Sequence, residues 1–341
     1  MKKGISHILV IMALLFAAGC SKDAADNAES AQEPQPASLK VVGLTRATSG
    51  NTDWDDIHIY LTSSGTQVAE GKFGYANDTK EWSTHLKLKS GAGTFRLYGF
   101  MPDDPSLTAS LQNVTAVDAA VDAQIKLENV NPLTTIDYCV VTGVRQVETA
   151  SDHTSATRGM FSFDYDSNHQ NYINLFLDHL MSRLVFNMKI SPTYDAVRTI
   201  KVKKMTLKLA DISSMRVTVT FSDNHGISAI SYFPTGFAAD SCIIENEAKT
   251  LTTSPAAICT GYMVPDNVFI NKLELKTEFE VYNKKGDKIA ERTAVNKLTE
   301  PLAELQRGEE RTLLLTIDPS YLYVLSDPDL DNPTIKLIID N

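Results

Sequence analysis

The chain has 341 residues, 43% of them hydrophobic, so it is long enough for about two globular domains with ordinary cores. Its formal net charge is -10, which argues against a basic surface that follows the phosphates of a nucleic acid. We therefore predict a globular protein without a nucleic-acid partner.

The first twenty residues have the pattern of an export signal. Two lysines at positions 2 and 3 precede an apolar run over 8–18, which is too short to span a bilayer. The run leads through small residues to Cys20 and resembles the lipobox of bacterial lipoproteins, although Ala17 stands where leucine is commoner. The sequence predicts a signal peptide over 1–20 and a lipid-bearing Cys20 after processing.

Residues 21–37 are predicted to be a flexible tether. They are rich in Ala, Ser, Asp, Glu, Gln and Pro and have no apolar periodicity, so they cannot bury enough surface to become ordered.

An apolar strand is predicted directly after the tether. Leu39, Val41, Val42 and Leu44 give it a buried face, and it ends at Arg46, the first arginine of the chain. Small, polar, turn-forming residues follow Arg46, so the bond to Ala47 is predicted to be exposed to proteases.

The rest of the first half contains further strands with period-two alternation. Residues 57–61 form one strand, and 63–65 form a turn. Residues 82–88 and 94–100, separated by glycines at 91–93, are expected to form a hairpin.

Two weakly patterned stretches, 103–135 and 146–170, are expected to be long loops or decorations of the first domain. The second of them ends in a polar run, and a domain boundary is therefore placed between residues 170 and 171.

The second half has the clearer pattern. Residues 172–182 fit both a helical and a strand period, and a strand is favoured. Half-buried antiparallel strands are then predicted from alternating apolar residues at Leu184, Phe186, Met188 and Ile190; at Met205, Leu207 and Leu209; at Leu273, Leu275, Phe279 and Val281; and at Leu313, Leu315 and Ile317. Short strands separated by turns predict an all-β fold with antiparallel β-sandwich domains over 38–170 and 171–341.

Catalytic and metal-binding motifs are not found. None of the seven histidines pairs with a glutamate at helical spacing, and no serine lies in a nucleophile elbow. The alternating acids of the segment Asp327–Asp331 could bind calcium, but an EF-hand would need glycine at Asn332 and glutamate at Ile338. The sequence therefore predicts no enzyme, no cofactor and no metal site.

Three cysteines follow Cys20. In an oxidising compartment Cys242 and Cys259 are candidates for a disulfide if their strands are neighbours, and Cys139 is then a small buried hydrophobe. Three unpaired buried thiols are the open alternative.

The chain ends in another alternating strand, over 333–341. Ile335, Leu337 and Ile339 lie on one face of it, and its length matches that of the strand over 38–46. Each of these two terminal strands could therefore fill a similar groove.

Taken over the whole chain, these features resemble the fimbrillin superfamily, the type V pilins of Bacteroidetes. The resemblance rests on the lipobox at Cys20, the tether, the arginine in the run 44–48, the two β-rich halves, the run from Asp178 to Phe186 and the C-terminal strand.

The resemblance implies two transthyretin-like sandwich domains in a subunit that is exported as an outer membrane lipoprotein. It implies cleavage between Arg46 and Ala47 by an arginine-specific protease, which releases the strand over 38–46 as a removable plug. A C-terminal strand of another subunit then fills the groove, as in donor-strand complementation. The implied partners are other pilin subunits and a surface ligand, and the implied location is the cell surface fimbrium.

Two alternatives stay open. A surface glycan-binding lipoprotein would need an exposed aromatic platform, for which the candidates are Trp54, Trp82 and the tyrosines at 321–323. A tip or anchor subunit of a pilus would share the fold but need not donate its last strand or release its first.

Overall fold

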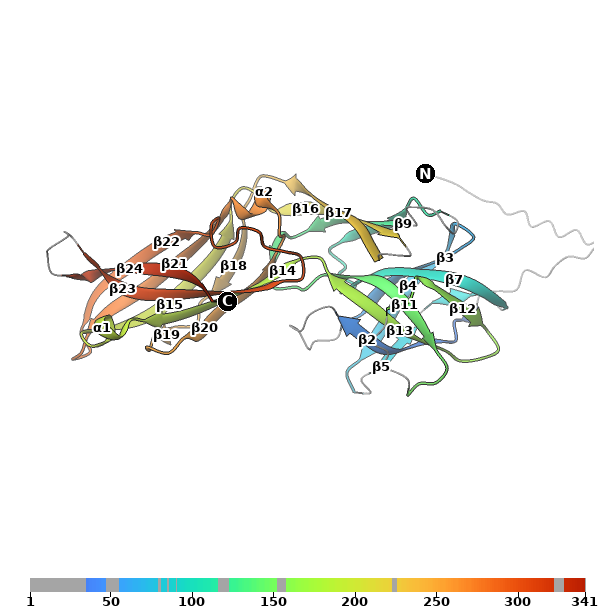
Figure 1. The fold of residues 1–341 in the computed structure, drawn as a ribbon, viewed down its shortest axis with the longest axis horizontal. Coiled ribbons are helices and arrows are strands. Elements are labelled where there is room, and N and C mark those ends of the chain that lie inside the picture. The colour runs from blue at the N-terminus through green and yellow to red at the C-terminus, as the bar shows by residue number, and fades with distance from the viewer. Residues whose placement is uncertain are drawn as a thin grey trace, which may run out of the picture. The chain divides into compact units, whose positions relative to one another are not determined.

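The computed structural model describes residues 35–46, 55–78, 81–84, 86–89, 91–115, 123–151, 158–222, 226–321 and 328–340. These residues belong to one compact unit and form twenty-four strands and two short helices, Pro192–Asp195 (α1) and Asn267–Ile270 (α2) (Figure 1). The prediction of an all-β fold is confirmed. Within these ranges, no helix has the length and apolar character needed to cross a membrane.

An eight-stranded sheet contains the first strands of the chain. Its order is β11-β13-β2-β5-β4-β3-β7-β12, and β7 also pairs with β11, so the seven strands other than β12 close into a ring. The strands are β2 (Leu39–Arg46), β3 (Ile57–Ser63), β4 (Thr66–Ala76), β5 (Glu81–Thr84), β7 (Ala92–Met101), β11 (Cys139–Val147), β12 (Ser162–Asp166) and β13 (Asn171–His179). A further pair joins β1 (Gln35–Pro36) to β6 (Lys87–Leu88).

The interior of the ring is apolar. Ile57, Ile59 and Leu61 of β3 are buried and share a hydrophobic cluster with Leu39 and Val41 of β2. The predicted turn after β3 is confirmed, because β3 and β4 form a hairpin with Ser64 and Gly65 at positive φ. Period-two alternation is therefore enough to orient β3.

Two further sheets lie in the second half of the chain, in the orders β10-β20-β14-β23-β24 and β18-β15-β21-β22, with β19 paired to β15. Their strands are β10 (Leu133–Thr134), β14 (Ser182–Ile190), β15 (Arg198–Leu209), β18 (Ser241–Glu245), β19 (Lys249–Thr250), β20 (Ala256–Met263), β21 (Leu273–Asn283), β22 (Lys288–Lys297), β23 (Glu310–Tyr321) and β24 (Pro328–Asp340).

The predicted strands of the second half are confirmed. Alternate residues of β14 are buried along its whole length, among them Phe186, and so are Leu207 of β15 and Leu275 of β21. The two sheets contribute these side chains to one hydrophobic cluster. Two sheets that pack face to face in this way remove the apolar side chains of alternate residues from water, which stabilises the fold.

A fourth sheet corrects the prediction of a long loop over 103–135. It has the order β17-β16-β9-β8 and contains β8 (Thr108–Gln112), β9 (Ala123–Val130), β16 (Ser214–Ser222) and β17 (Gly226–Gly236). β9 pairs with β8, which precedes it in the chain, and with β16, which lies about ninety residues further along the chain. A pattern search over neighbouring residues does not find such a distant partner.

Three other expectations also need correction. Residues 82–88 and 94–100 do not form a hairpin, because β5 pairs with β2 and β4 whereas β7 pairs with β3, β11 and β12. The stretch 146–170 is not all loop, since it contains β12. The sheets are not wholly antiparallel, because β2 is parallel to β13 and β14 is parallel to β23.

The ambiguous segment after residue 170 is a strand, as the sequence favoured. This strand, β13, pairs with β11 and β2 and so belongs to the sheet of the first half. The chain leaves that sheet only after His179 and enters β14 at Ser182. The division into two independently folding domains stays a prediction.

Candidate functional site

The strand β2 completes the closed ring. It runs parallel to β13 from the pair Leu39 with Asn171 to the pair Arg46 with Leu177, and on its other side a single pair joins Val41 to Trp82 of β5 (Figure 1). One side of β2 is therefore paired from end to end with one irregularity, at Val42, and the other side is paired at one position.

The start of β2 is fixed by polar contacts. The backbone N–H and the side-chain amide of Asn171, which is buried, both donate to the carbonyl oxygen of Ser38, at 2.9 Å each. The backbone N–H of Ser38 in turn donates to the hydroxyl of Tyr165, at 3.2 Å. Just before β2, the N–H of Ala37 donates to the carbonyl of Leu86.

The predicted plug residues divide into two groups. The side chains of Leu39 and Val41 are 1% and 4% exposed and belong to the cluster inside the ring, whereas Val42 and Leu44 are half-buried. Burying a side chain of this size stabilises by roughly 1.5 to 3 kcal/mol, and each net backbone hydrogen bond adds about 0.5 to 1.5 kcal/mol. Removal of β2 would therefore uncover apolar surface and the backbone edge of β13.

The predicted processing point lies at the end of this strand. Arg46 is the last residue of β2, and its backbone pairs with that of Leu177. Ala47 lies outside the described residues. The lipidation residue Cys20 also lies outside them.

The C-terminal strand lies at the edge of its sheet. This strand, β24, has thirteen residues and starts earlier than predicted, at Pro328. It pairs antiparallel with β23 alone among the strands of the described sheets, and the predicted donor residues Ile335, Leu337 and Ile339 pair with Ile317, Leu315 and Leu313 (Figure 1). An edge strand at a chain end can detach without breaking any other strand pair.

The end of β13 is held by a loop from the second half. Arg307 donates from Nη1 to the backbone carbonyl of His179 at 2.7 Å and forms an ion pair with Asp178 at 3.5 Å. The backbone N–H of Gly308 donates to the carbonyl of Met181 at 2.9 Å. The 306–308 loop therefore fixes the point at which the chain passes from one sheet to the next.

We expect Arg307→Ala to lower the free energy of unfolding by about 1 to 2 kcal/mol, because one charge-assisted hydrogen bond and a partly exposed ion pair are lost. Urea denaturation followed by circular dichroism measures the change. Lys285→Ala, at an exposed position in the turn between β21 and β22, is the control and should change it by less than about 0.5 kcal/mol. Equal stability of the two variants would contradict the assigned role.

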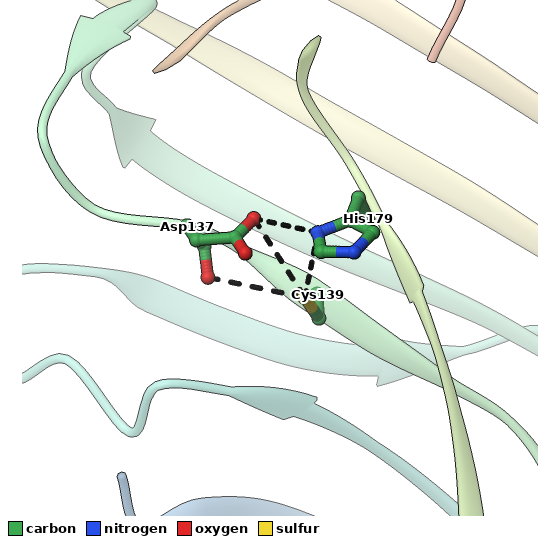
Figure 2. A group of neighbouring side chains, drawn as sticks. All are labelled: Asp137, Cys139 and His179. Atoms are coloured by element: carbon green, nitrogen blue, oxygen red, sulfur yellow. Dashed lines mark hydrogen bonds and ion pairs between the residues drawn. The ribbon is translucent and has the colours of Figure 1, made fainter. Parts of the chain in front are cut away.

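The structure also brings together three residues that the sequence search did not connect. Asp137, Cys139 and His179 are buried, and Figure 2 shows their side chains pointing toward one another. The Nδ1 atom of His179 lies 2.8 Å from Oδ1 of Asp137 and 3.5 Å from Sγ of Cys139, and that Sγ lies 3.8 Å from the same Oδ1. The thiol is 0% exposed, so a substrate cannot reach it.

The sequence could reveal this cluster only to a reader who knew the register in which β11 and β13 pair. Cys139 and His179 are directly paired across β11 and β13, and Asp137 comes two residues before Cys139. The separation of forty residues hides the pair until the two strands are aligned.

A disulfide between Cys242 and Cys259 required their strands to be neighbours, and these two strands do not pair with each other. Cys242 is exposed on β18, which pairs with β15, and Cys259 is buried on β20, which pairs with β10 and β14. Both thiols are free. Burial raises the pKa of the Cys259 thiol to about 11 and so keeps it protonated at neutral pH.

The aromatic residues do not supply the platform required by the glycan-binding alternative. Trp82 is 7% exposed, packs against Tyr75 with 4.7 Å between ring centroids, and donates from Nε1 to the carbonyl of Asp55. Trp54, Tyr323 and Asp327 lie outside the described residues. The rest of the segment predicted to be an acidic loop, Pro328 to Asp331, belongs to β24.

Comparison with known proteins gives structural relatives. No family model matches the chain, and no curated protein sequence matches it. A fimbrial protein from Bacteroides vulgatus is similar over 88% of this chain and 99% of its own, with 15% identity and a TM-score of 0.44. A proposed cell adhesion protein from Bacteroides uniformis is similar over 90% and 98%, with 12% identity and a TM-score of 0.43. The fimbrial anchor protein Mfa2 from Porphyromonas gingivalis is similar over 89% and 96%, with 13% identity and a TM-score of 0.29.

Proposed function

We propose that this chain is a structural subunit of a cell surface fimbrium, matured by cleavage after Arg46 and polymerised by strand exchange. The observation that carries the proposal is the position of β2. It is paired along one whole side with β13 and at one position with β5, so its loss would open the ring at one place.

The slot left by β2 has the properties of a strand acceptor. Seven of the nine residues of β13 are buried, and β13 keeps its pairing with β11 when β2 is absent. An exposed backbone edge beside an apolar interior favours the addition of another strand, since hydrogen bonds and apolar burial are both regained. In this proposal, a strand of another subunit fills the slot left by β2.

The donor in this proposal is β24. It has enough residues to replace β2, which has eight, and it is an edge strand. Alternate apolar residues at Ile335, Leu337 and Ile339 match the period-two pockets that a half-buried strand needs. In this proposal β24 exchanges its intramolecular pairing with β23 for pairing in the slot of the next subunit.

The N-terminal sequence supplies the route to the surface. The lipid on Cys20 would hold the precursor in the outer membrane, and the tether over 21–37 would let an arginine-specific protease reach Arg46. Cleavage would separate the lipid and β2 from the subunit in one step. A subunit that keeps β2 would be an anchor, and a subunit that does not donate β24 would be a tip.

The first test is limited digestion of the purified chain with an arginine-specific protease, followed by mass spectrometry and size analysis. We expect an early single cut after Arg46, followed by loss of the N-terminal fragment that ends at Arg46 and carries β2, and by formation of SDS-resistant oligomers. A cut without oligomers would favour a tip subunit. Resistance of Arg46 in a folded chain would remove the main support for the plug, and binding to a glycan array would then test the alternative.

A further inference from the structure

The buried cluster of Asp137, Cys139 and His179 contains three different metal-ligating groups on two strands and the segment before them. Their ligand atoms all lie within 4.8 Å of one another. Cys139 and His179 face each other across the β11 and β13 pair, and Cys139 is also paired with Met101 of β7. The cluster therefore lies where the ring closes, beside the paired strands β7, β11 and β13.

The distances fit a tetrahedral site for a small divalent ion. Bonds of zinc to sulfur, nitrogen and oxygen at tetrahedral angles place sulfur about 3.6 Å from the other two atoms, and nitrogen about 3.4 Å from oxygen. The corresponding distances are 3.5 Å from Sγ to Nδ1, 3.8 Å from Sγ to Oδ1 and 2.8 Å from Nδ1 to Oδ1. Only the last pair must separate, by about 0.6 Å, as the metal replaces the proton between those two atoms.

The charges of the three ligands also fit. A thiolate at Cys139, a carboxylate at Asp137 and a neutral imidazole at His179 together carry two negative charges, so a divalent ion makes the buried site neutral overall. A neutral site costs much less to bury than an uncompensated charge. The carboxylate can complete the coordination by binding through both of its oxygens.

The ligand types select the class of metal. Thiolate and imidazole ligands suit zinc and similar ions, whereas calcium and magnesium prefer sites made of oxygen atoms. The backbone of His179 is also held from outside the cluster, because its carbonyl accepts a hydrogen bond from Arg307.

We propose that Asp137, Cys139 and His179 bind one zinc ion and that this ion links the end of β13 to β11. Binding releases the thiol proton of Cys139 to solvent, and the neutral ring of His179 gives up its proton at Nδ1 and takes one up at Nε2 by exchange with solvent, so that the ring keeps a single proton. His179 lies two residues beyond Leu177, which pairs with Arg46. The ion would therefore brace the wall of the β2 slot, and it would bind whether or not the chain polymerises.

The test uses the full chain in detergent, freed of metal with a chelator and titrated with Zn²⁺ or with Co²⁺ as a spectroscopic probe. We expect one equivalent of metal by elemental analysis and, with cobalt, a thiolate charge-transfer band and the intense visible bands of tetrahedral coordination. At a hundredfold excess of free Zn²⁺ over Kd, the Tm should rise by about 4 °C. A chain without the cobalt bands and without a Tm shift would overturn the proposal.

Variants identify the ligands. Cys139→Ser and His179→Gln should lose the cobalt bands and the Tm shift, while circular dichroism checks that they fold. Cys20→Ser, Cys242→Ser and Cys259→Ser remove the thiols outside the cluster and should keep both signals. Bands that persist in Cys139→Ser but vanish in Cys242→Ser would assign the metal to the exposed thiol and overturn the proposal. If a cluster variant does not fold, the titration of the unaltered chain still decides whether a thiolate-bound metal is present.

Discussion

Arg46→Ala should leave the fold unchanged and abolish fibre assembly. Arg46 is the last residue of β2, so truncation of its side chain removes the feature that an arginine-specific protease recognises while the backbone pairing with Leu177 remains. The free energy of unfolding should change by less than about 0.5 kcal/mol, because the backbone pairing of β2 is kept. Uncleaved β2 keeps the slot filled, and no strand of another subunit can enter.

Electron microscopy of cells or of purified protein shows whether the variant forms fibres. Gel electrophoresis in SDS shows whether it forms SDS-resistant ladders. Arg145→Ala, at an exposed position on β11, is the matched control and should be processed normally. Arg46→Lys gives a sharper test, since it should resist the arginine-specific protease and regain assembly when a lysine-specific protease is added. Ordinary fibres from Arg46→Ala would show that cleavage at this bond is not needed.

Val41→Asp should weaken the attachment of β2 more than any other single change in that strand. Val41 is 4% exposed in the apolar cluster of the ring and is the residue that pairs with both Ile173 and Trp82. An unpaired carboxylate at such a position costs about 3 to 5 kcal/mol. The chain can escape part of this cost by letting β2 detach, so the measured loss of unfolding free energy is limited by the free energy of detaching that strand.

Hydrogen exchange of the β2 and β13 amides, together with urea denaturation, measures the effect. We expect faster exchange in both strands and oligomers that form without cleavage. Lys40→Asp introduces the same side chain at the adjacent exposed position and should change the unfolding free energy by less than about 0.5 kcal/mol. If Val41→Asp lost stability throughout the molecule while β2 stayed protected, β2 would be an ordinary core strand and not a separable plug.

Much of the local structure could be predicted because it depends on neighbouring residues. β14 and β21 each have an apolar residue at nearly every second position, and a half-buried strand needs only that pattern. The turn at 63–65 was recognisable from its glycine and polar residues, which suit the tight connection of the β3–β4 hairpin. The terminal strands β2 and β24 were also predicted from their alternating apolar residues.

Pairing between distant segments could not be predicted in this way. The pairing of β9 with the distant β16 was missed, although β9 also pairs with its neighbour β8, and β7 was assigned to the wrong hairpin because its true partners are β3, β11 and β12. The parallel pairing of β2 with β13 joins segments more than a hundred residues apart. Apolar periodicity orients the faces of a strand, but it does not choose between several strands with equally apolar faces.

The sequence by itself determined that the chain is rich in half-buried strands, and it marked Arg46 and the two apolar terminal strands, because these features depend on residue type and short spacing. Only the tertiary structure decided that β2 completes a ring beside β13, that β24 lies at a sheet edge, and that Asp137, Cys139 and His179 meet in the interior. These features depend on strand order and register, which are set by the combined burial of many side chains and not by any single segment.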